Sequence, residues 1–469
     1  MSRKLLLLLI AVLAVKAIVL ACDAEPAFQF GDSSAYLGTA LSKWIPHDRS
    51  FVYGFILRRI VVHPHSLQPL IVVQVILSGI ASWLVGICLL RYLRVKFVIA
   101  AICCIGCALE PLQLMFERFV MTETMSIFAL AVLMLLSFSY LKTSSLLLLV
   151  LIQVVGVFLF SLRYSYLPLI LVLSVLLPLL AGSARRPHWR PVVLALFLSL
   201  GLSQVLLLGY RHLYGRLAHG PAEYSSQDGI FLVADMAPIV KPIDFPLAGK
   251  RDAVFGGLKF PLADPEMRRS HRWLPGGLCQ MIQTAGDNEE EANRLARKTA
   301  LRAMKRDPFG VLKLAVFTFS EFFNHERVMW NLELDQGKYV DPTPGDVEML
   351  KSFFGVDLTK RNFDSLTKRW EGYSVVWCGV TVTLPLIYLV FIALNWSQIT
   401  APEILCAATA LILLATAVIP VEIPNPRYII PLGWIDFLLM GSMLAKLYWQ
   451  EILNHGKHDA PVGNFKTES

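Results

Sequence analysis

Four short motifs of this chain carry ionisable side chains beside apolar segments, and their residue types suit acid–base and anion-binding chemistry. Asp32 lies in FGDSSAYLGTALS, Glu123 in MFERFVMTETM, Arg163 in FSLRYSYLP and Arg427 in IPNPRYIIP. A carboxylate can take a proton from a hydroxyl group, and a guanidinium can hold an anion through two parallel hydrogen bonds. Charges at membrane depth are costly, so each of these residues needs a functional or a structural explanation.

Each residue also has a structural alternative. Asp32 could cap a helix that begins at Ser33, because aspartate beside small polar residues is a common N-cap. Glu123 would be stabilised by the dipole at the start of a helix. Arg163 and Arg427 could extend toward lipid headgroups.

The composition of the chain indicates that an integral membrane protein must position these motifs. Of the 469 residues, 55% are hydrophobic and 17% are charged, and the mean hydropathy is +0.57. A soluble globular domain is less apolar. Windows of about 18 or more residues with almost no charge are long enough to cross the hydrocarbon core as helices. We expect an all-α polytopic protein with about ten transmembrane helices, at residues 5–21, 69–90, 97–115, 120–141, 145–162, 164–181, 191–210, 373–395, 402–420 and 429–448.

Basic residues in the short loops predict the orientation of these helices. Most of them fall on one side of the predicted membrane, namely Arg3, Lys4, Arg91, Arg94, Lys96, Lys142, Arg185, Arg186, Arg190 and Lys446. The positive-inside rule makes that side cytoplasmic, together with both termini. The four motifs then lie on the extracytoplasmic face. The pI near 9.0 reflects this topology and contact with anionic membrane lipids, and no motif supports nucleic acid binding.

The predicted spans divide the chain into four parts. We expect a transmembrane module of about seven helices at residues 1–210 with a first extracytoplasmic loop at 22–67, a loop domain at 211–372, further transmembrane helices at 373–449 and a cytoplasmic tail at 450–469. In the loop domain, a helix should begin with Asp287 or Asn288 as N-cap and stop before Pro308. The stretch 224–278 shows no pattern of functional residues.

One segment of the loop domain controls the topology. We read residues 309–323 as an interfacial helix, because they are apolar but few and carry Lys313 and Glu321. If this segment crossed the membrane instead, Arg427 would lie on the cytoplasmic side.

The cysteines add little to this interpretation. Cys103, Cys104 and Cys107 fall in an apolar span, where buried thiols are ordinary packing residues. Cys22 and Cys279 face the oxidising side in this topology, and a disulfide between them is left open.

The order of the motifs resembles the GT-C superfamily of membrane glycosyltransferases, in the branch of protein O-mannosyltransferases and the lipid A aminoarabinose transferase. The resemblance rests on GDSSAYLGTALS, ERFVMTETMSIFALAVLML, FSLRYSYLPLIL and PNPRYIIPL in that order. It implies a GT-C-like fold and an inverting transfer of a hexosyl or pentosyl group from a polyprenyl phosphate to an acceptor hydroxyl. Asp32 matches the catalytic base of that branch. The resemblance also implies an enzyme of cell envelope glycans, in a bacterial inner membrane with its site facing the periplasm.

The residue types suit this reaction. One carboxylate suffices as base because the leaving group is already a phosphate, whereas a glycosidase typically needs a second carboxyl. We predict that Tyr36, Glu123, Arg163, Arg427 and Tyr428 bind substrate, with the two arginines on the phosphate. Tyr36 follows Asp32 by four residues on the same helical face, although an interfacial aromatic would also fit there.

The first loop departs from the family pattern at one position. It has Asp-Ser where protein mannosyltransferases often have Asp-Glu, so we expect a lipid or glycan acceptor. The loop also has no D-x-D pair, which metal-dependent members often have, so we expect no divalent metal or other cofactor. A metal site at His63 and His65 has little support.

Two other functions remain open from the sequence. A polymerase or ligase of lipid-linked glycans would share the donor chemistry. A transporter or flippase would have as many spans, but its charges belong at the membrane midplane, and the charges here are expected at one surface.

Overall fold

The computed structural model describes residues 3–29, 31–183, 189–339, 342–358 and 366–458 of the chain. Within these ranges the chain forms helices and loops, and the only β contact is an isolated bridge between Ala27 and Phe119. The expected all-α membrane protein is confirmed at this level. Eight segments of the described chain are long and apolar enough to cross a membrane: α1 (Arg3–Cys22), α4 (Gln68–Arg91), α7 (Glu123–Thr143), Tyr164–Gly182 with α9 (Leu167–Ser183), α10 (Trp189–Ala218), Lys368–Leu394 with α20 (Ser374–Leu394), α21 (Ala401–Val418) and Ile430–Tyr448 in α22 (Ile430–His458).

Two of the predicted spans form shorter helices, α5 (Phe97–Ala108) and α8 (Leu146–Leu162). The prediction of one helix over 97–115 is wrong, because α5 ends at Ala108 and a separate helix, α6 (Pro111–Phe116), follows. Proline lacks a backbone N–H and disfavours helical conformation in the residue before it. The side chain of Glu110 then caps α6 by accepting hydrogen bonds from the backbone N–H groups of Leu112 at 3.1 Å and Gln113 at 2.5 Å.

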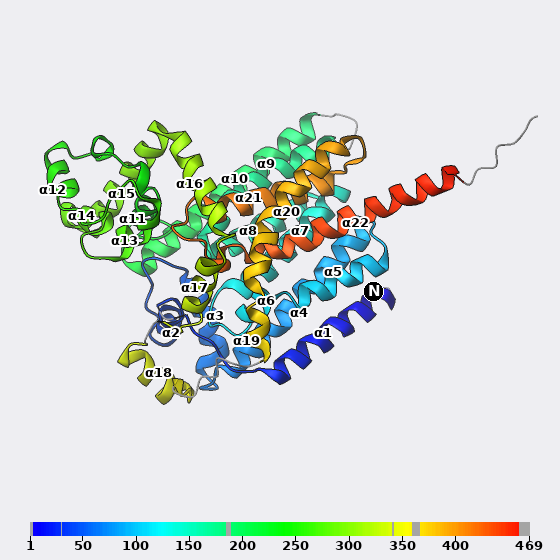
Figure 1. Ribbon diagram of the computed structural model, residues 1–469, viewed down its shortest axis with the longest axis horizontal. Coiled ribbons are helices and arrows are strands. Elements are labelled where there is room, and N and C mark those ends of the chain that lie inside the picture. Colours follow the sequence, from blue (N-terminus) through cyan, green and yellow to red (C-terminus); the bar gives the residue numbers. More distant parts are fainter. Residues whose placement is uncertain (1–2, 30, 184–188, 340–341, 359–365, 459–469) are drawn as a thin grey trace, which may run out of the picture.

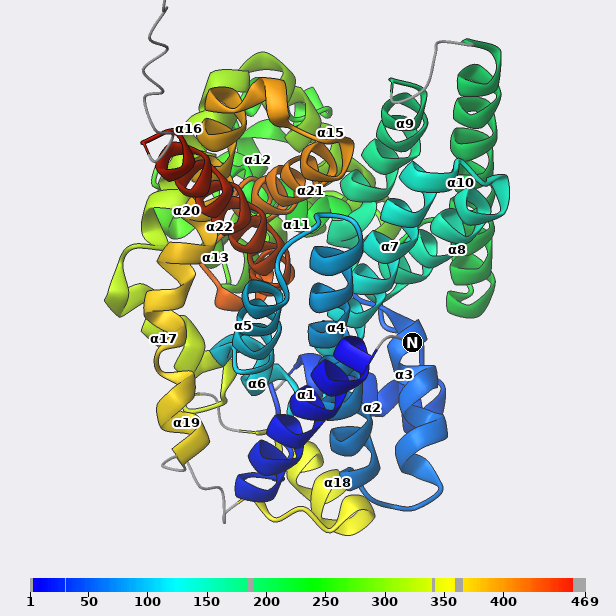
Figure 2. The same cartoon turned by 90° about the vertical axis from the view of Figure 1, so that its right-hand side faces the viewer.

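The helices form a bundle with two distinct ends. The start of α1 and the end of α22 lie at one end, on the right of Figure 1, whereas α2 (Asp32–Ser42) and the helices between α10 and α19 (Leu366–Glu371) lie at the other. Figure 2 shows α4 and α22 inside the bundle, with α1 and α10 at its edges. Exposed apolar side chains such as Leu7 and Phe197 lie on these edge helices, as expected of a lipid-facing surface.

The first loop is itself helical. It contains α2 and α3 (Phe51–Leu57), and α3 continues as a short π-helix, Arg58–Val62.

Residues 219–339 and 342–358, here called the insert, form a small helical unit at the same end as α2. It comprises α11 (Asp228–Asp235), α12 (Arg251–Gly256), α13 (Arg268–Trp273), α14 (Leu278–Ala285), α15 (Glu289–Arg306), α16 (Pro308–Glu321), α17 (His325–Asp335) and α18 (Pro344–Phe354). Most of it packs around its own apolar core, which includes Val233, Phe245 and Ile282.

Several predictions about the insert can be compared with its helices. The helix capped by Asn288 and stopped before Pro308 is confirmed, because the Asn288 side chain accepts a hydrogen bond from the Glu291 N–H at 2.9 Å. The helix expected over residues 191–210 is longer in the structure, since α10 continues to Ala218. Residues 309–323 form α16, whose Leu314 is buried and whose Phe309 is exposed. Their interfacial placement stays a prediction, and residues 459–469 of the predicted tail lie outside the described residues.

The cysteines are all free thiols, and the open question of a disulfide between Cys22 and Cys279 has a negative answer in this structure. Cys279 is buried and donates a hydrogen bond to the carbonyl of Ile230 at 3.2 Å.

An ion pair lies inside the helix bundle, apart from the predicted site residues. Lys16 of α1 pairs with Glu117, and both side chains are 1% exposed. Ser78 of α4 donates a second hydrogen bond to the same carboxylate oxygen, at 2.5 Å. Asp436 of α22 is also fully buried in the bundle. Lys16 lies six residues before the end of α1, about 9 Å into the helix at 1.5 Å per residue.

Candidate functional site

A cavity of about 370 Å³ lies at the end of the bundle that carries α2 and the insert. Four carboxylates and four arginines contribute to its wall, namely Asp32, Asp48, Asp335, Glu422, Arg49, Arg269, Arg272 and Arg427. An anion that binds Arg49 or Arg427 must compete with the Asp32 carboxylate already paired with them.

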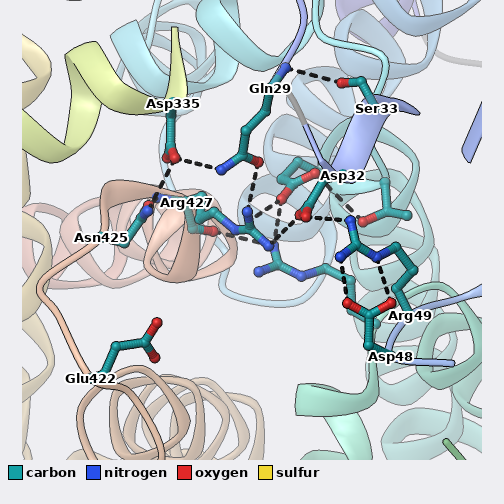
Figure 3. A network of polar contacts seen from close by, with 12 residues as sticks. Gln29, Asp32, Ser33, Asp48, Arg49, Asp335, Glu422, Asn425 and Arg427 are labelled. Atoms are coloured by element: carbon teal, nitrogen blue, oxygen red, sulfur yellow. Dashed lines mark hydrogen bonds and ion pairs between the residues drawn. The ribbon is translucent and has the colours of Figure 1, made fainter. Parts of the chain in front are cut away.

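Asp32 is the first residue of α2 and faces the cavity. Gly31 precedes it with φ 95°, and no side chain caps the helix, so the alternative that Asp32 is the N-cap is wrong. A positive φ favours glycine, so Gly31 can serve as the N-cap of α2. The Asp32 carboxylate is then not used to cap the helix. That carboxylate pairs with Arg49 and with Arg427, whose Nη2 lies 2.9 Å from Oδ2 (Figure 3).

Two guanidinium groups determine the ionisation of Asp32. Burial alone would raise the pKa of its carboxyl, but the charge of Arg427, and next that of Arg49, hold the pKa below its ordinary value. Asp32 is therefore an ionised and weakly basic carboxylate as long as both arginines contact it.

Arg427 is fixed by the residues just before α22. Asn425 and Pro426 turn the chain, and the Asn425 side chain accepts a hydrogen bond from the Arg427 N–H at 2.9 Å. The guanidinium donates to Oε1 of Gln29 at 2.6 Å, and its Nε lies 3.8 Å from Oε1 of Glu123. The Nε atom is buried and makes no hydrogen bond within the described part of the chain.

Glu123 and Arg163 meet behind Arg427. Glu123 starts α7 and is 1% exposed, and its Oε1 lies 3.5 Å from Nη1 of Arg163. Arg163 also donates to the backbone carbonyl of Arg427 at 3.2 Å. Both residues thus support Arg427, and neither contributes to the cavity wall described above.

The two predicted tyrosines lie in the cavity wall. The ring of Tyr36 packs edge-on against Tyr53, with ring centroids 4.9 Å apart. The ring of Tyr428 lies 5.2 Å from the guanidinium carbon of Arg427 and 5.8 Å from that of Arg163. At these distances the ring faces can stabilise the cations.

Arg49 and Asp48 were missed by sequence reasoning. Both side chains line the cavity, and Arg49 Nε donates to Oδ1 of Asp48 at 2.9 Å while a second nitrogen contacts Oδ2 (Figure 3). The acid–base pair in HDRS, on the same loop as Asp32, was the available signal.

The insert also contributes to the cavity wall, from the stretch 224–278 in which the sequence shows no pattern of functional residues. Arg269, Arg272 and Trp273 of α13 line the cavity. Arg272 pairs with Glu422 at 2.6 Å and stacks over the ring of Phe231, 3.9 Å from its centroid. The basic run RRSHRW was a usable signal, but Glu422, the partner of Arg272, lies 150 positions away in the sequence.

Asp335, the last residue of α17, is a second buried carboxyl in the wall. Its Oδ1 accepts hydrogen bonds from Gln29 at 2.6 Å and from Asn425 at 3.3 Å (Figure 3). Burial raises its pKa to about 7 against the lowering effect of Arg427. No local motif marked this residue, because its partners are contributed by the two loops before α2 and α22.

No group of three or more His, Cys, Asp and Glu side chains suited to a metal ion occurs in the described ranges. The ring of His65 instead packs against Phe353, with centroids 4.4 Å apart. Comparison with known proteins adds no assignment, since the chain matches no protein-family model and no curated protein sequence.

Proposed function

We propose that the protein is a GT-C-like glycosyltransferase that moves a sugar from a polyprenyl phosphate to an acceptor hydroxyl, with inversion and with Asp32 as the base. One observation carries the proposal: the Asp32 carboxylate and the Arg427 guanidinium pair with each other in the wall of a polar cavity at one end of an apolar helix bundle. A donor with a lipid tail, a phosphate and a polar sugar needs a polar site next to an apolar surface.

In this reaction the donor phosphate competes with Asp32 for Arg427. As the guanidinium turns to the phosphate, Asp32 loses the charge that lowers its pKa most strongly, and it becomes a stronger base. The acceptor oxygen then attacks the anomeric carbon, its proton passes to Asp32, and the bond from that carbon to the phosphate oxygen breaks. The electron pair of that bond stays on the polyprenyl phosphate, whose charge Arg427 stabilises.

A ten-crossing topology with this site on the extracytoplasmic face is part of the proposal. Nζ of Lys96, just before α5, lies 3.7 Å from the ring centroid of Tyr448. Tyr448 is near the far end of α22 from Arg427, so α5 starts at the end of the bundle away from the site. Glu123 at the start of α7 meets Arg427, so α5 and α6 together return the chain to the site. The short helix α8 does the same, since it ends next to Arg163.

Two rival functions are separable from this one. A polymerase or ligase of lipid-linked glycans would use the same donor site and differ in its acceptor. A transporter is favoured by the buried pair of Lys16 and Glu117, because paired charges within a bundle often mark ion pathways. That pair is enclosed by α1, α4 and α6, and the cavity does not include it.

The deciding experiment uses the full chain in lipid nanodiscs with undecaprenyl-phosphate-linked glucose, galactose, mannose and arabinose. A bacterial lipid extract supplies acceptors. We expect release of undecaprenyl phosphate with at least one donor, and no release by Asp32→Asn. If no donor is consumed, and the protein in liposomes exchanges a labelled lipid-linked sugar between leaflets, the transporter is correct.

A further inference from the structure

Asp335 has one carboxylate oxygen that the protein leaves unused. The side chain is 1% exposed and lines the cavity. Oδ1 is held by the amide groups of Gln29 and Asn425, at 2.6 and 3.3 Å. Oδ2 is buried, and no described residue supplies it with a hydrogen-bond partner. An unsatisfied buried carboxyl oxygen costs free energy, which a bound polar group can recover.

The position of Asp335 is coupled to the proposed reaction centre. Gln29 donates to Asp335 through its amide nitrogen and accepts from Arg427 through its amide oxygen at 2.6 Å. Arg427 in turn pairs with Asp32. Figure 3 shows this continuous chain of contacts from α17 to α2. A ligand group at Asp335 would therefore lie near the base without touching it.

The groups around Asp335 select the kind of ligand. Burial raises the pKa of its carboxyl to about 7, Arg427 and Asn425 oppose that rise, and the charges of Asp32 and Glu123 add to it. Near neutral pH the carboxyl can donate or accept a hydrogen bond. A phosphate at Oδ2 would directly face the carboxyl group of Asp335, with no arginine between them, whereas a hydroxyl group can complement either protonation state.

We infer that Asp335 is a specificity-determining residue that hydrogen-bonds a hydroxyl group of the transferred sugar. This inference rests on the proposed function and adds a contact to the sugar, as distinct from the phosphate. Gln29 and Asn425 act as positioning residues that orient the carboxyl.

The test separates sugar binding from phosphate binding. Affinity is measured in nanodiscs for undecaprenyl phosphate alone and for the same carrier linked to glucose, galactose, mannose or arabinose. The wild-type protein should bind one of the sugar-linked carriers more tightly than the bare carrier. Asp335→Ala should lose about tenfold of that gain, the size expected for a hydrogen bond to a charged group, and should bind the bare carrier like wild type. Asp252→Asn, on the exposed surface of α12, is the matched control.

A second measurement needs no variant. The wild-type protein is tested with donors that lack one sugar hydroxyl at a time, and one deoxy position should lose the same tenfold in affinity. In Asp335→Ala that deoxy position should cause no further loss.

The outcomes are distinguishable. If the wild-type protein does not bind undecaprenyl phosphate at all, the proposed function fails. If it binds the carrier but Asp335→Ala keeps the full gain from the sugar, or no deoxy donor binds more weakly, the assignment of Asp335 is overturned. An equal loss for bare and sugar-linked carriers would also overturn it, because Asp335 would then act on the phosphate site.

Discussion

Two ion pairs of this protein look alike in composition and differ in what surrounds them. Lys16 and Glu117 lie inside the helix bundle, each 1% exposed. Asp32 and Arg427 lie in a cavity wall, with side chains 21% and 18% exposed. Glu117 accepts hydrogen bonds from Lys16 and Ser78 in packed surroundings. Arg427 is shared among Asp32, Gln29 and Glu123, and its Nε has no hydrogen bond among the described residues.

The difference shows how a site can be told from a structural ion pair. A pair that is saturated and enclosed has no capacity for a ligand, and breaking it exposes a buried charge. A shared pair at a cavity can exchange one partner for a ligand of the same charge. The variants below test this contrast, from the largest expected effect to the smallest.

Asp32→Asn should reduce sugar transfer by roughly 10² to 10⁴-fold, because a positioned base contributes about that much. The amide keeps the shape of the side chain, so the thermal unfolding midpoint should change little. Turnover of undecaprenyl-phosphate sugar in nanodiscs is the measurement. Activity within threefold of wild type would remove Asp32 from the role of base.

Lys16→Met should destabilise the fold by about 3 to 5 kcal/mol, the usual result of leaving one buried charge unpaired. The double variant Lys16→Met/Glu117→Gln should recover much of that loss, because no charge remains. Unfolding in detergent measures both, and transfer per folded molecule should stay near wild type. A double variant that folds well but transfers no sugar would show that this pair has a functional role. The distinction between a structural pair and a site pair would then fail.

Asp335→Asn should change how stability depends on pH. The pKa of the carboxyl is 3.8 in the reference state and about 7 in the fold, so the folded state keeps a proton that the unfolded chain loses. The associated stability is complete below about pH 4 and is lost as the pH rises to 7, at up to about 1.4 kcal/mol per pH unit. The amide does not titrate, so the variant should gain stability relative to wild type between pH 5 and pH 7. The measurement is the free energy of unfolding of both proteins at each pH. If it depends on pH in the same way for the variant and the wild type, the raised pKa is contradicted.

Arg427→Lys should weaken donor use by about tenfold, since lysine keeps the charge and loses the planar pair of donors. The dependence of transfer on donor concentration measures this effect, with Arg427→Ala as the more severe change. Arg59→Lys is the control, because Arg59 is an exposed arginine of the first loop. If both Arg427 variants match wild type, Arg427 does not hold the donor phosphate, and the other arginines of the cavity wall become the candidates.

Chelation should have the smallest effect. The carboxylates Asp32 and Asp48 contact arginines, an arrangement that suits anion binding better than metal binding. We expect EDTA to leave transfer unchanged. A protein silenced by EDTA and revived by Mg²⁺ or Mn²⁺ would show that the cavity holds a metal.

The sequence by itself determined the class of fold and most of the apolar helices. Long runs without charge can satisfy their backbone groups in a membrane only as helices, and this constraint acts locally. The cap at Asn288 and the stop before Pro308 are equally local, and both were predicted correctly. The break at Pro111 was also readable, but the apolar run around it concealed it.

Only the tertiary structure decided which charges meet. Asp32 and Arg427 were predicted to act together, yet nothing in the sequence shows that Gln29 links Arg427 to Asp335. The local signals of Arg49 and Arg272 do not name their partners in the fold either. The hydrogen bond from Gln29 to Asp335 spans 306 positions. Likewise, the sequence shows Lys16 only as a charge within an apolar run, and the fold shows that Glu117 is its partner. A charge finds its partner through the packing of distant helices, and spacing along the chain does not encode that distance.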